Sequence, residues 1–404
     1  MIDTDAVVVA AVRTPIGRAG KGSLAQMRAD DLAALAVGAA LAAVPEIAPS
    51  EIEDLMLGCA QPAAEQGFNM ARVVAVLCGH SHLPGVTVNR YCSSSLQTIR
   101  MATHAIRAGE GECFIAAGAE SCSHFDKGNA DRVPDTKNPR FAAAQARTTR
   151  RSEGGCEPWS ASELPDIYVA MGQTAENVAE LRAVTREEMD AFALRSHERA
   201  VAAQRAGLFD AEIVPVQTPD GAIVTSDDGP RADTSLERLA QLKPAFRVDG
   251  RATAGNSCPL NDGAAAVVLT SAAFARGHEI QPLARIVSTG VSALDPEIMG
   301  LGPVEASRSA LRRAGMTIDD VDLVEINEAF AAQVIPSARD LGIDPGKLNV
   351  NGGAIALGHP FGMTGARILT TLLNALRRRD ATIGLETMCV GGGQGMALVV
   401  ERLA

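Results

Sequence analysis

The chain has 404 residues, more than one compact hydrophobic core usually holds and enough for two. Hydrophobic residues make up 47% and aromatic residues only 3%, so the core must consist of small aliphatic side chains, as in helices packed on a parallel sheet. The 37 basic and 48 acidic residues give a net charge of −11, which argues against binding to nucleic acid or to an anionic membrane surface.

The start of the chain enters an apolar run directly, without the regions of a secretory signal peptide. No run of about 18 apolar residues predicts a membrane span. The eight cysteines show no framework spacing, and a chain of this size needs no covalent cross-links. We therefore expect a soluble cytoplasmic protein with free thiols.

Strands and helices are predicted to alternate over residues 1–121. Short apolar runs predict strands at 6–12, 54–59, 86–90 and 113–117, and stretches with helical periodicity predict helices at 30–44, 69–78 and 93–108. This order predicts a sheet covered by helices, which is an α/β fold.

Residues 122–250 differ in character, because they are polar and punctuated by Arg, Asp, Pro and Gly. One amphipathic helix is predicted near 187–206. We expect this segment to be an inserted lid over the functional site, after which the first half resumes at about 251–275.

The same order of elements restarts in residues 276–404. Strands are predicted at 283–289, 322–326, 348–350, 382–388 and 396–401, and helices at 304–314, 329–341 and 364–379. Two pairs of similar fragments support an internal duplication: Glu51-Ile-Glu-Asp-Leu with Asp320-Val-Asp-Leu-Val, and Val86-Thr-Val-Asn with Leu348-Asn-Val-Asn.

Cys92 stands where a predicted strand stops and a helix begins, in Asn89-Arg-Tyr-Cys-Ser-Ser-Ser. At a helix N-terminus, the dipole and the unpaired N–H groups favour a thiolate, so we expect the thiol pKa to lie below its usual value of about 8.5. A lone cysteine is more often a small buried side chain, so the interpretation depends on its neighbours.

Two Gly-rich segments of the second half supply candidate neighbours. His359 lies in a Gly-rich loop between a strand and a helix, where an imidazole can take the proton of a thiol or can simply donate to a loop carbonyl. Cys389 precedes Val-Gly-Gly-Gly-Gln-Gly, whose N–H groups are candidates for an oxyanion hole. These glycines lead into a strand and not a helix, which argues against a dinucleotide site.

These segments resemble the thiolase family, nearly end to end and in the family's order. The resemblance runs from Val12-Arg-Thr-Pro-Ile-Gly to Cys389-Val-Gly-Gly-Gly-Gln-Gly-Met, and it includes Asn327-Glu-Ala-Phe and Thr253-Ala-Gly-Asn-Ser-Cys-Pro-Leu-Asn-Asp-Gly. It implies two similar βαβαβαββ halves around shared central helices, in a layered αβαβα arrangement with the lid inserted in the first half.

By this resemblance Cys92 is the acylated nucleophile, His359 activates it, and Cys389 exchanges a proton with C2 of acetyl-CoA. Asn327 would hold a water that, with His359, stabilises the enolate oxygen, and the N–H groups of Cys92 and Gly391 would hold the acyl oxyanion. The implied reaction is the reversible cleavage of a 3-ketoacyl-CoA by CoA to acetyl-CoA and a shortened acyl-CoA. The resemblance implies a homodimer or homotetramer that uses CoA as a substrate, without a permanently bound cofactor or metal.

Position in the matching segments also predicts the residues around the CoA channel, with Arg231 able to meet the adenosine phosphates. Most of them could equally be core or rim residues. The predicted set is Met171, Arg231, Phe246, Ala254, Cys258, Leu260, Met299 and Phe330.

Three positions depart from the family pattern. Ser95 stands where Gly is usual, Cys258 replaces a common Ser near the pantetheine, and Ala170 stands where acetoacetyl-CoA-forming members have His. The last departure favours a degradative 3-ketoacyl-CoA thiolase over the alternative, a biosynthetic acetoacetyl-CoA-forming enzyme.

Two further alternatives are a decarboxylating ketoacyl synthase, which typically has His where this chain has Cys389, and a catalytically silent CoA-binding homologue. The segment 78–82 holds one Cys and two His but lacks a fourth ligand, so we expect a solvated turn and no metal site. The basic run 147–151 is expected to be a solvated face of the lid or, alternatively, a contact for the CoA phosphates.

Overall fold

The computed structural model describes residues 1–125, 136–155, 159–161 and 163–404. Its main sheet has the order β10-β11-β12-β9-β1-β8-β5-β3-β4, with β2 (Gly17–Arg18) paired to β8. The strands of the first half are β1 (Ala6–Arg13), β3 (Asp54–Gly58), β4 (Gly85–Val88), β5 (Cys113–Ser121) and β8 (Asn261–Ser271). Those of the second half are β9 (Ala284–Ala293), β10 (Leu323–Ile326), β11 (Ile383–Val390) and β12 (Gln394–Arg402).

The two halves repeat one strand pattern. In the first half β3 is parallel to β5, which is antiparallel to β8, which is antiparallel to β1. In the second half β10, β11, β12 and β9 follow each other with the same relative directions. The predicted strand at 348–350 is only a parallel bridge from Leu348 to Val324, beside β10 as β4 lies beside β3. The duplication read from the sequence is therefore present in the topology.

The halves also share a sheet edge. β1 and β9 are antiparallel neighbours over two residue pairs, Val7 with Arg285 and Val8 with Ala284. This edge-to-edge pairing was not predicted from the sequence, because nothing in either strand shows which of its two edges meets a partner.

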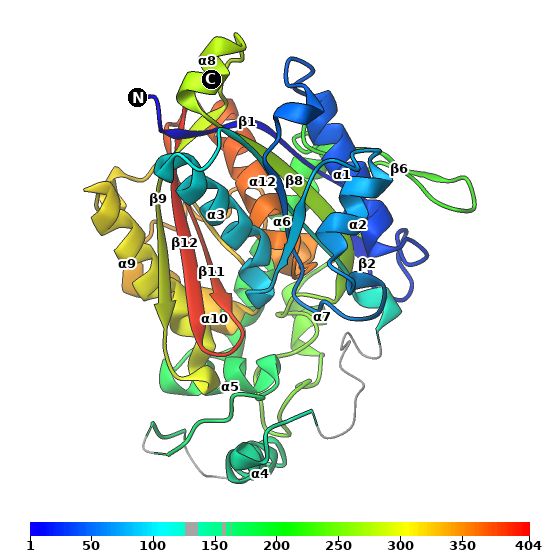
Figure 1. Cartoon of the computed structure of the whole chain (residues 1–404). Coiled ribbons are helices and arrows are strands. Elements are labelled where there is room, and N and C mark those ends of the chain that lie inside the picture. Colours follow the sequence, from blue (N-terminus) through cyan, green and yellow to red (C-terminus); the bar gives the residue numbers. More distant parts are fainter. Residues whose placement is uncertain (126–135, 156–158, 162) are drawn as a thin grey trace.

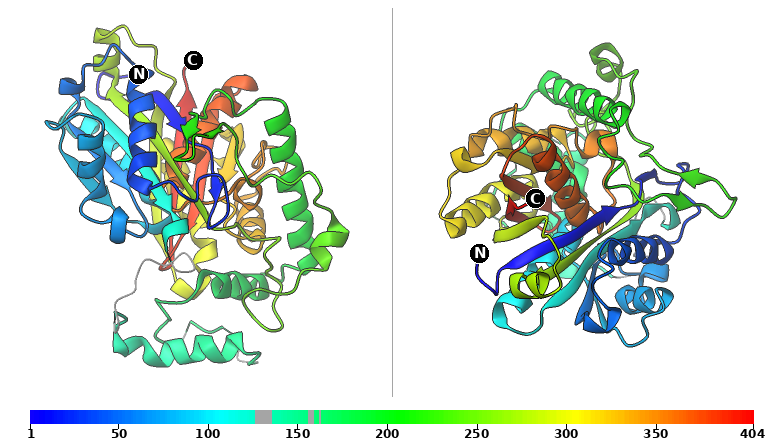
Figure 2. Two further views of the ribbon diagram at one scale, coloured as in Figure 1. Left: turned by 90° about the vertical axis from the view of Figure 1, so that its right-hand side faces the viewer. Right: turned by 90° about the horizontal axis from the view of Figure 1, so that it is seen from above.

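Helices lie between the two halves of the sheet and on both of its outer faces. α3 (Ser94–Ala108) and α12 (Thr364–Arg378) pack against each other and against strands of both halves, in the middle of the molecule (Figure 1). α1 (Ala29–Ala42) and α2 (Met70–Leu77) cover one outer face, and α9 (Gly302–Ala314) with α10 (Ala331–Leu341) lies on the other side (Figures 1 and 2). The αβαβα arrangement is confirmed.

The central helices are buried because each packs a broad apolar face against its neighbours. α12 buries Ile368, Leu369, Leu372 and Leu376, and it joins α3 in one core cluster. Burial of these apolar faces holds the two helices in the shared central layer. Short helices α8 (Ala272–Gly277) and α11 (Ala354–Leu357) complete the two halves.

The regular elements of the inserted segment are mainly helices. It contains α4 (Ala142–Ser152), α5 (Met171–Leu181), α6 (Arg186–Arg205), α7 (Leu236–Ala240) and a hairpin of β6 (Val216–Gln217) and β7 (Ile223–Val224). α4 and α5 lie at the end of the molecule where the turn between β11 and β12 is found (Figure 1). The domain boundaries at 121, 250 and 275 stay predictions.

Arg13 of β1 ties the inserted segment to the sheet. Its guanidinium is fully buried and lies 2.7 Å from a carboxylate oxygen of both Glu212 and Asp227. A guanidinium in a dry interior is stable only when paired in this way, so the segment is anchored at a defined place.

Most predicted elements agree with the structure within two or three residues. The main omission is β8, which was part of a family motif but was not assigned as a strand, although Ala264–Leu269 is a continuous apolar run. β5 also runs on to Ser121. No helix of the described ranges is both long and apolar enough to cross a bilayer.

Candidate active site

Cys92 lies in a single 3-10 turn, Tyr91–Ser93, between β4 and α3. Tyr91 has φ 44°, and its N–H donates to Asn89 Oδ1 at 2.8 Å, which fixes the reversal of the chain. Ser94 Oγ accepts the N–H of Arg90 at 2.9 Å and donates to the carbonyl of Tyr91 at 2.6 Å. Local side-chain contacts therefore hold the thiol at the start of the helix.

The Cys92 thiol is a weaker acid than we expected. Burial raises its pKa to about 11, and the charge of Glu120 adds to this, whereas hydrogen bonds from the N–H groups of Gly391 and Cys92 itself lower it. The expected depression of the pKa is therefore wrong for the free enzyme, because desolvation outweighs the helix N-terminus. The thiol is protonated at neutral pH and needs a base.

Two further thiols lie close to Cys92. Burial raises the pKa of Cys389, on β11, well above its usual value, and the nearby Cys92 and Cys258 thiols add to the shift. Burial likewise raises the pKa of Cys258, with a smaller contribution from Cys92. The structure thus places three protonated thiols in one apolar region.

His359 is buried and neutral, because burial, helped by the charge of Arg367, lowers its pKa to about 3. Its Nδ1 lies 2.7 Å from Oγ1 of Thr364, and that hydroxyl donates to the carbonyl of Pro360 at 2.7 Å. Because the hydroxyl hydrogen of Thr364 points to Pro360, its oxygen must accept a hydrogen bond from Nδ1–H of His359. The imidazole is therefore the Nδ1–H tautomer, and its Nε2 can accept a proton. Sequence reasoning missed Thr364, which stands five residues after His359.

Asn327 connects His359 to the strand that carries Cys389. Its Nδ2 lies 3.3 Å from His359 Nε2, and its backbone N–H donates to the carbonyl of Thr387 at 3.0 Å. Its Oδ1 is buried without a hydrogen-bond partner among the described residues. A buried amide oxygen in this state is a free acceptor beside the imidazole.

Five of the predicted CoA residues share one core cluster with Cys389, and the rings of Phe246 and Phe330 meet edge to face at 5.8 Å. Arg231 is exposed and lines a different pocket, of about 220 Å³, together with His197 and Arg205. Ala254 and Leu260 are exposed. The five clustered residues are Met171, Phe246, Cys258, Met299 and Phe330.

Two arginines of the basic run in the inserted segment are paired with carboxylates. Arg151 is buried, with Nη1 2.6 Å from Glu297, and Arg147 lies 2.7 Å from Glu163. Arg147 and Arg151 are therefore neither fully solvated nor free contacts for phosphates, and a role of the run at the CoA phosphates stays a prediction. No group of three or more His, Cys, Asp or Glu side chains in the described ranges is arranged to hold a metal ion, and seven cysteines there are free, while Cys156 lies outside those ranges.

Comparison with known proteins agrees with this architecture. Residues 6–273 match the family model described as "Thiolase, N-terminal domain" and residues 280–402 match "Thiolase, C-terminal domain". The chain is 44% identical to the 3-ketoacyl-CoA thiolase of Bacillus subtilis (strain 168), over 98% of this chain and 99% of that protein. It is 43% identical to the 3-ketoacyl-CoA thiolase of Aeromonas hydrophila, over 99% and 100%.

Two solved structures cover almost the whole chain. The Bacillus anthracis acetyl-CoA acetyltransferase superposes with a TM-score of 0.86 at 39% identity, covering 99% of each chain. Human mitochondrial 3-ketoacyl-CoA thiolase superposes with a TM-score of 0.87 at 37% identity, covering 99% of this chain and all of that one, 100%. Fold and sequence agree over nearly the whole chain, and the chain therefore belongs to the thiolase family of acyltransferases.

Proposed function

We propose that the chain cleaves 3-ketoacyl-CoA with CoA, giving acetyl-CoA and an acyl-CoA shortened by two carbons, and that the reaction is reversible. The observation that carries the proposal is the protonated Cys92 thiol, which accepts the N–H of Gly391 two residues after a second buried thiol, Cys389. Full-length relatives named 3-ketoacyl-CoA thiolase support this substrate class.

In the first step, Cys92 attacks the 3-keto carbon while its proton moves to Nε2 of His359. Because the thiol pKa is about 11 and the imidazole pKa about 3, the ion pair is not the resting state. Proton transfer must accompany attack, when the thiolate charge passes to the substrate oxygen. The N–H groups of Cys92 and Gly391 are the proposed donors to that oxygen.

The C2–C3 bond then breaks, leaving an acyl group on Cys92 and the enolate of acetyl-CoA. The protonated imidazole of His359 now carries Nε2–H and can donate to the enolate oxygen. Asn327 Oδ1, buried without a partner among the described residues, is the proposed anchor of the water that completes this second oxyanion site. Cys389 gives its proton to C2 and becomes a thiolate.

In the second half-reaction, the Cys389 thiolate takes the proton of incoming CoA. The CoA sulfur attacks the acyl thioester, and the leaving Cys92 sulfur recovers the proton held by His359. All three groups return to their starting states, so the cycle needs no bound cofactor. CoA is the proposed second substrate, in a channel along the cluster of Met171, Phe246 and Phe330. Arg231, which lies outside this cluster, stays the predicted contact for its phosphates.

A second candidate is the formation of acetoacetyl-CoA from two acetyl-CoA. It is favoured by the superposition on the Bacillus anthracis acetyl-CoA acetyltransferase, at slightly higher identity than the human 3-ketoacyl-CoA thiolase. Thiolysis rates over a series from acetoacetyl-CoA to a long-chain 3-ketoacyl-CoA decide between the two. Activity with the four-carbon substrate alone would support the second candidate. A homodimer or homotetramer and a cytoplasmic location stay predictions.

The test of the central proposal is mass spectrometry after mixing the enzyme with 3-ketoacyl-CoA. We expect an acyl adduct on the peptide that contains Cys92, absent from Cys92→Ala. An adduct only on Cys389 or Cys258 would refute these roles.

A further inference from the structure

Three side chains of the first half hold the backbone of the segment that carries His359. Asn261 Oδ1, at the start of β8, accepts the N–H of His359 at 2.9 Å. Glu120 Oε2, on β5, accepts the N–H of Gly362 at 2.9 Å, and Ser95 Oγ, on α3, accepts the N–H of Ala366 at 2.9 Å. Three points along one segment of the second half are therefore fixed to the half that carries Cys92.

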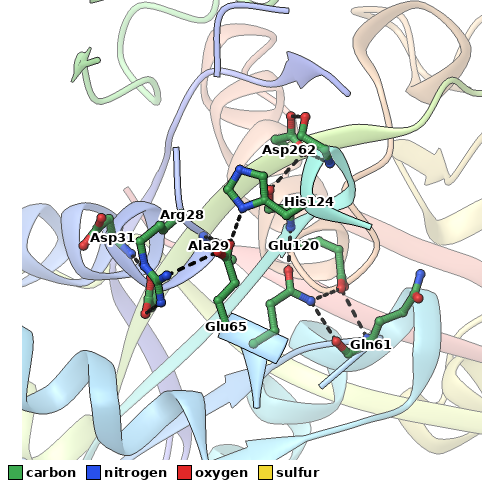
Figure 3. Close-up of polar contacts among 12 residues, drawn as sticks. Arg28, Ala29, Asp31, Gln61, Glu65, Glu120, His124 and Asp262 are labelled. Atoms are coloured by element: carbon green, nitrogen blue, oxygen red, sulfur yellow. Dashed lines mark hydrogen bonds and ion pairs between the residues drawn. The ribbon is translucent and has the colours of Figure 1, made fainter. Parts of the chain in front are cut away.

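Glu120 is the charged member of this group and is fully buried. Besides Gly362, its oxygens receive the N–H groups of Ala60 at 2.9 Å and Gln61 at 3.2 Å and the side-chain amide of Gln66 at 2.6 Å. Figure 3 shows Glu120 beside Gln61, and nearby His124, which contacts Glu65, and Asp262, which accepts the N–H of Ser123. All the partners are donors, as an ionised carboxylate requires.

The backbones of the two halves are in close contact beside Glu120. A Cβ on Gly362 would lie 2.4 Å from the carbonyl oxygen of Ala119, and one on Gly118 would lie 2.1 Å from the carbonyl oxygen of Gly362. Backbone therefore meets backbone at the point where Glu120 binds. The segment cannot shift without losing either this packing or the hydrogen bond.

The same segment contains the residue that orients the imidazole. Thr364, which receives Nδ1–H of His359, lies between Gly362 and Ala366, whose N–H groups are held by Glu120 and Ser95. Ser95 also satisfies an N–H in the first turn of α12, which has no partner within its own helix. The position of the imidazole and the position of its partner thus depend on first-half acceptors.

We infer that Glu120, Ser95 and Asn261 are positioning residues that hold His359 against the half carrying Cys92, acting through Gly362, Ala366 and the His359 backbone. The inference rests on the proposed role of His359 as the base. It also explains Ser95, which departs from the glycine usual in the family.

The first test is the rate of acylation of Cys92 by acetyl-CoA in single-turnover experiments. Ser95→Ala removes the acceptor but keeps the Cβ, and we expect a loss of about fivefold. In Glu120→Gln one acceptor oxygen becomes an NH₂ group, which faces N–H donors in either orientation of the new amide. The Gln66 amide cannot turn round to accept from this group, because its own oxygen accepts the N–H of Ser121. We expect a loss of about 10- to 100-fold. The KM for acetyl-CoA should stay unchanged in both variants.

A double-mutant cycle separates positioning of His359 from a general structural role. In a His359→Ala background, Ser95→Ala and Glu120→Gln should change the residual acylation rate by less than about twofold. Thr98→Val and Asp262→Asn are the matched controls, because no hydrogen bond of their side chains among the described residues reaches the second half. Full effects in the His359→Ala background would overturn the inference, as would controls that behave like Ser95→Ala.

A second readout does not depend on turnover. With ¹⁵N-labelled histidines, of which the chain has 7, His359 should show an Nδ1–H tautomer in the wild type and in Thr98→Val. Ser95→Ala should show a mixture of tautomers or a broadened signal. An unchanged His359 spectrum in Ser95→Ala would overturn the inference even if Glu120→Gln did not fold. A wild type with this spectrum but no acyl adduct would instead count against the proposed function alone.

Discussion

Nδ1 of His359 lies 2.7 Å from the hydroxyl of Thr364, and the hydroxyl hydrogen is already used by the carbonyl of Pro360. This relationship decides which imidazole nitrogen is free to accept a proton. Orientation of a base by a third group is the arrangement that nucleophile activation requires.

Replacing Thr364 by Val should therefore slow acylation of Cys92 without unfolding the protein. The shape of the side chain is kept, but Nδ1 loses its acceptor and the imidazole loses its tautomer preference. We therefore expect the acylation rate to fall by about 10- to 100-fold. Thr364→Ser should restore most of the rate. Thr370→Val is the control, since Thr370 is equally buried on α12 and donates only to Ala366. Equal losses in both valine variants would contradict the assignment.

The pH dependence of Cys92 alkylation tests the state of the free thiol. A pKa of about 11 predicts that the rate with iodoacetamide keeps rising between pH 7 and pH 10 in proportion to the thiolate fraction. His359→Ala should show the same slope, because the neutral imidazole, with a pKa of about 3, does not add charge over this range. A plateau below pH 8 would mean that a thiolate is already present.

The second thiol is tested by Cys389→Ser. Serine keeps the shape but is a much weaker acid, so this variant should still accept an acyl group on Cys92 and should lose exchange of the acetyl-CoA methyl hydrogens with solvent. Deuterium uptake in heavy water measures the exchange. Cys113→Ser, a change at another buried thiol, controls for altered stability. Near wild-type exchange and thiolysis in Cys389→Ser would make the second thiol structural.

Glu325 should make the protein less stable in mild alkali. Burial raises its pKa to about 8, so the folded state binds a proton that the unfolded state releases near pH 4.5. The corresponding stabilisation is complete below pH 4.5 and is lost as the pH rises through 8. Glu325→Gln mimics the neutral acid, and it should gain stability relative to wild type at pH 9 in urea unfolding. The exposed Glu46→Gln should show no such gain; equal curves for Glu325→Gln and wild type at pH 9 would contradict the shift.

Features could be predicted from the sequence where the pattern that indicates them lies within one segment of the chain. The helix after Cys92 and the buried helix α12 were predicted because their apolar periodicity is complete within one segment. Cys92, His359 and Cys389 stood out because each follows a predicted strand, although the structure places Cys389 within β11 and His359 after α11. The family resemblance then suggested that the three residues form one active site. The comparisons show the family itself.

The properties that were missed depend on residues far apart in the chain. The thiol pKa was expected to fall because the helix N-terminus is visible in the sequence, whereas the burial that raises it comes from tertiary packing. Ser95 was noted only as a departure, since its partner Ala366 is 271 residues away. No local pattern identifies an acceptor whose donor lies in the other half.

The place of β1 in the sheet has a consequence for biogenesis. This strand is made long before its partners, which are β8, where Val7 faces Thr270, and β9, where Val7 faces Arg285. During synthesis it cannot pair until about two-thirds of the chain has left the ribosome, and contacts of such long sequence separation form slowly. The first strand, an apolar segment, must therefore wait unpaired. A nascent chain of this protein should depend on chaperone protection of its N-terminus far more than a chain whose first hairpin closes on itself.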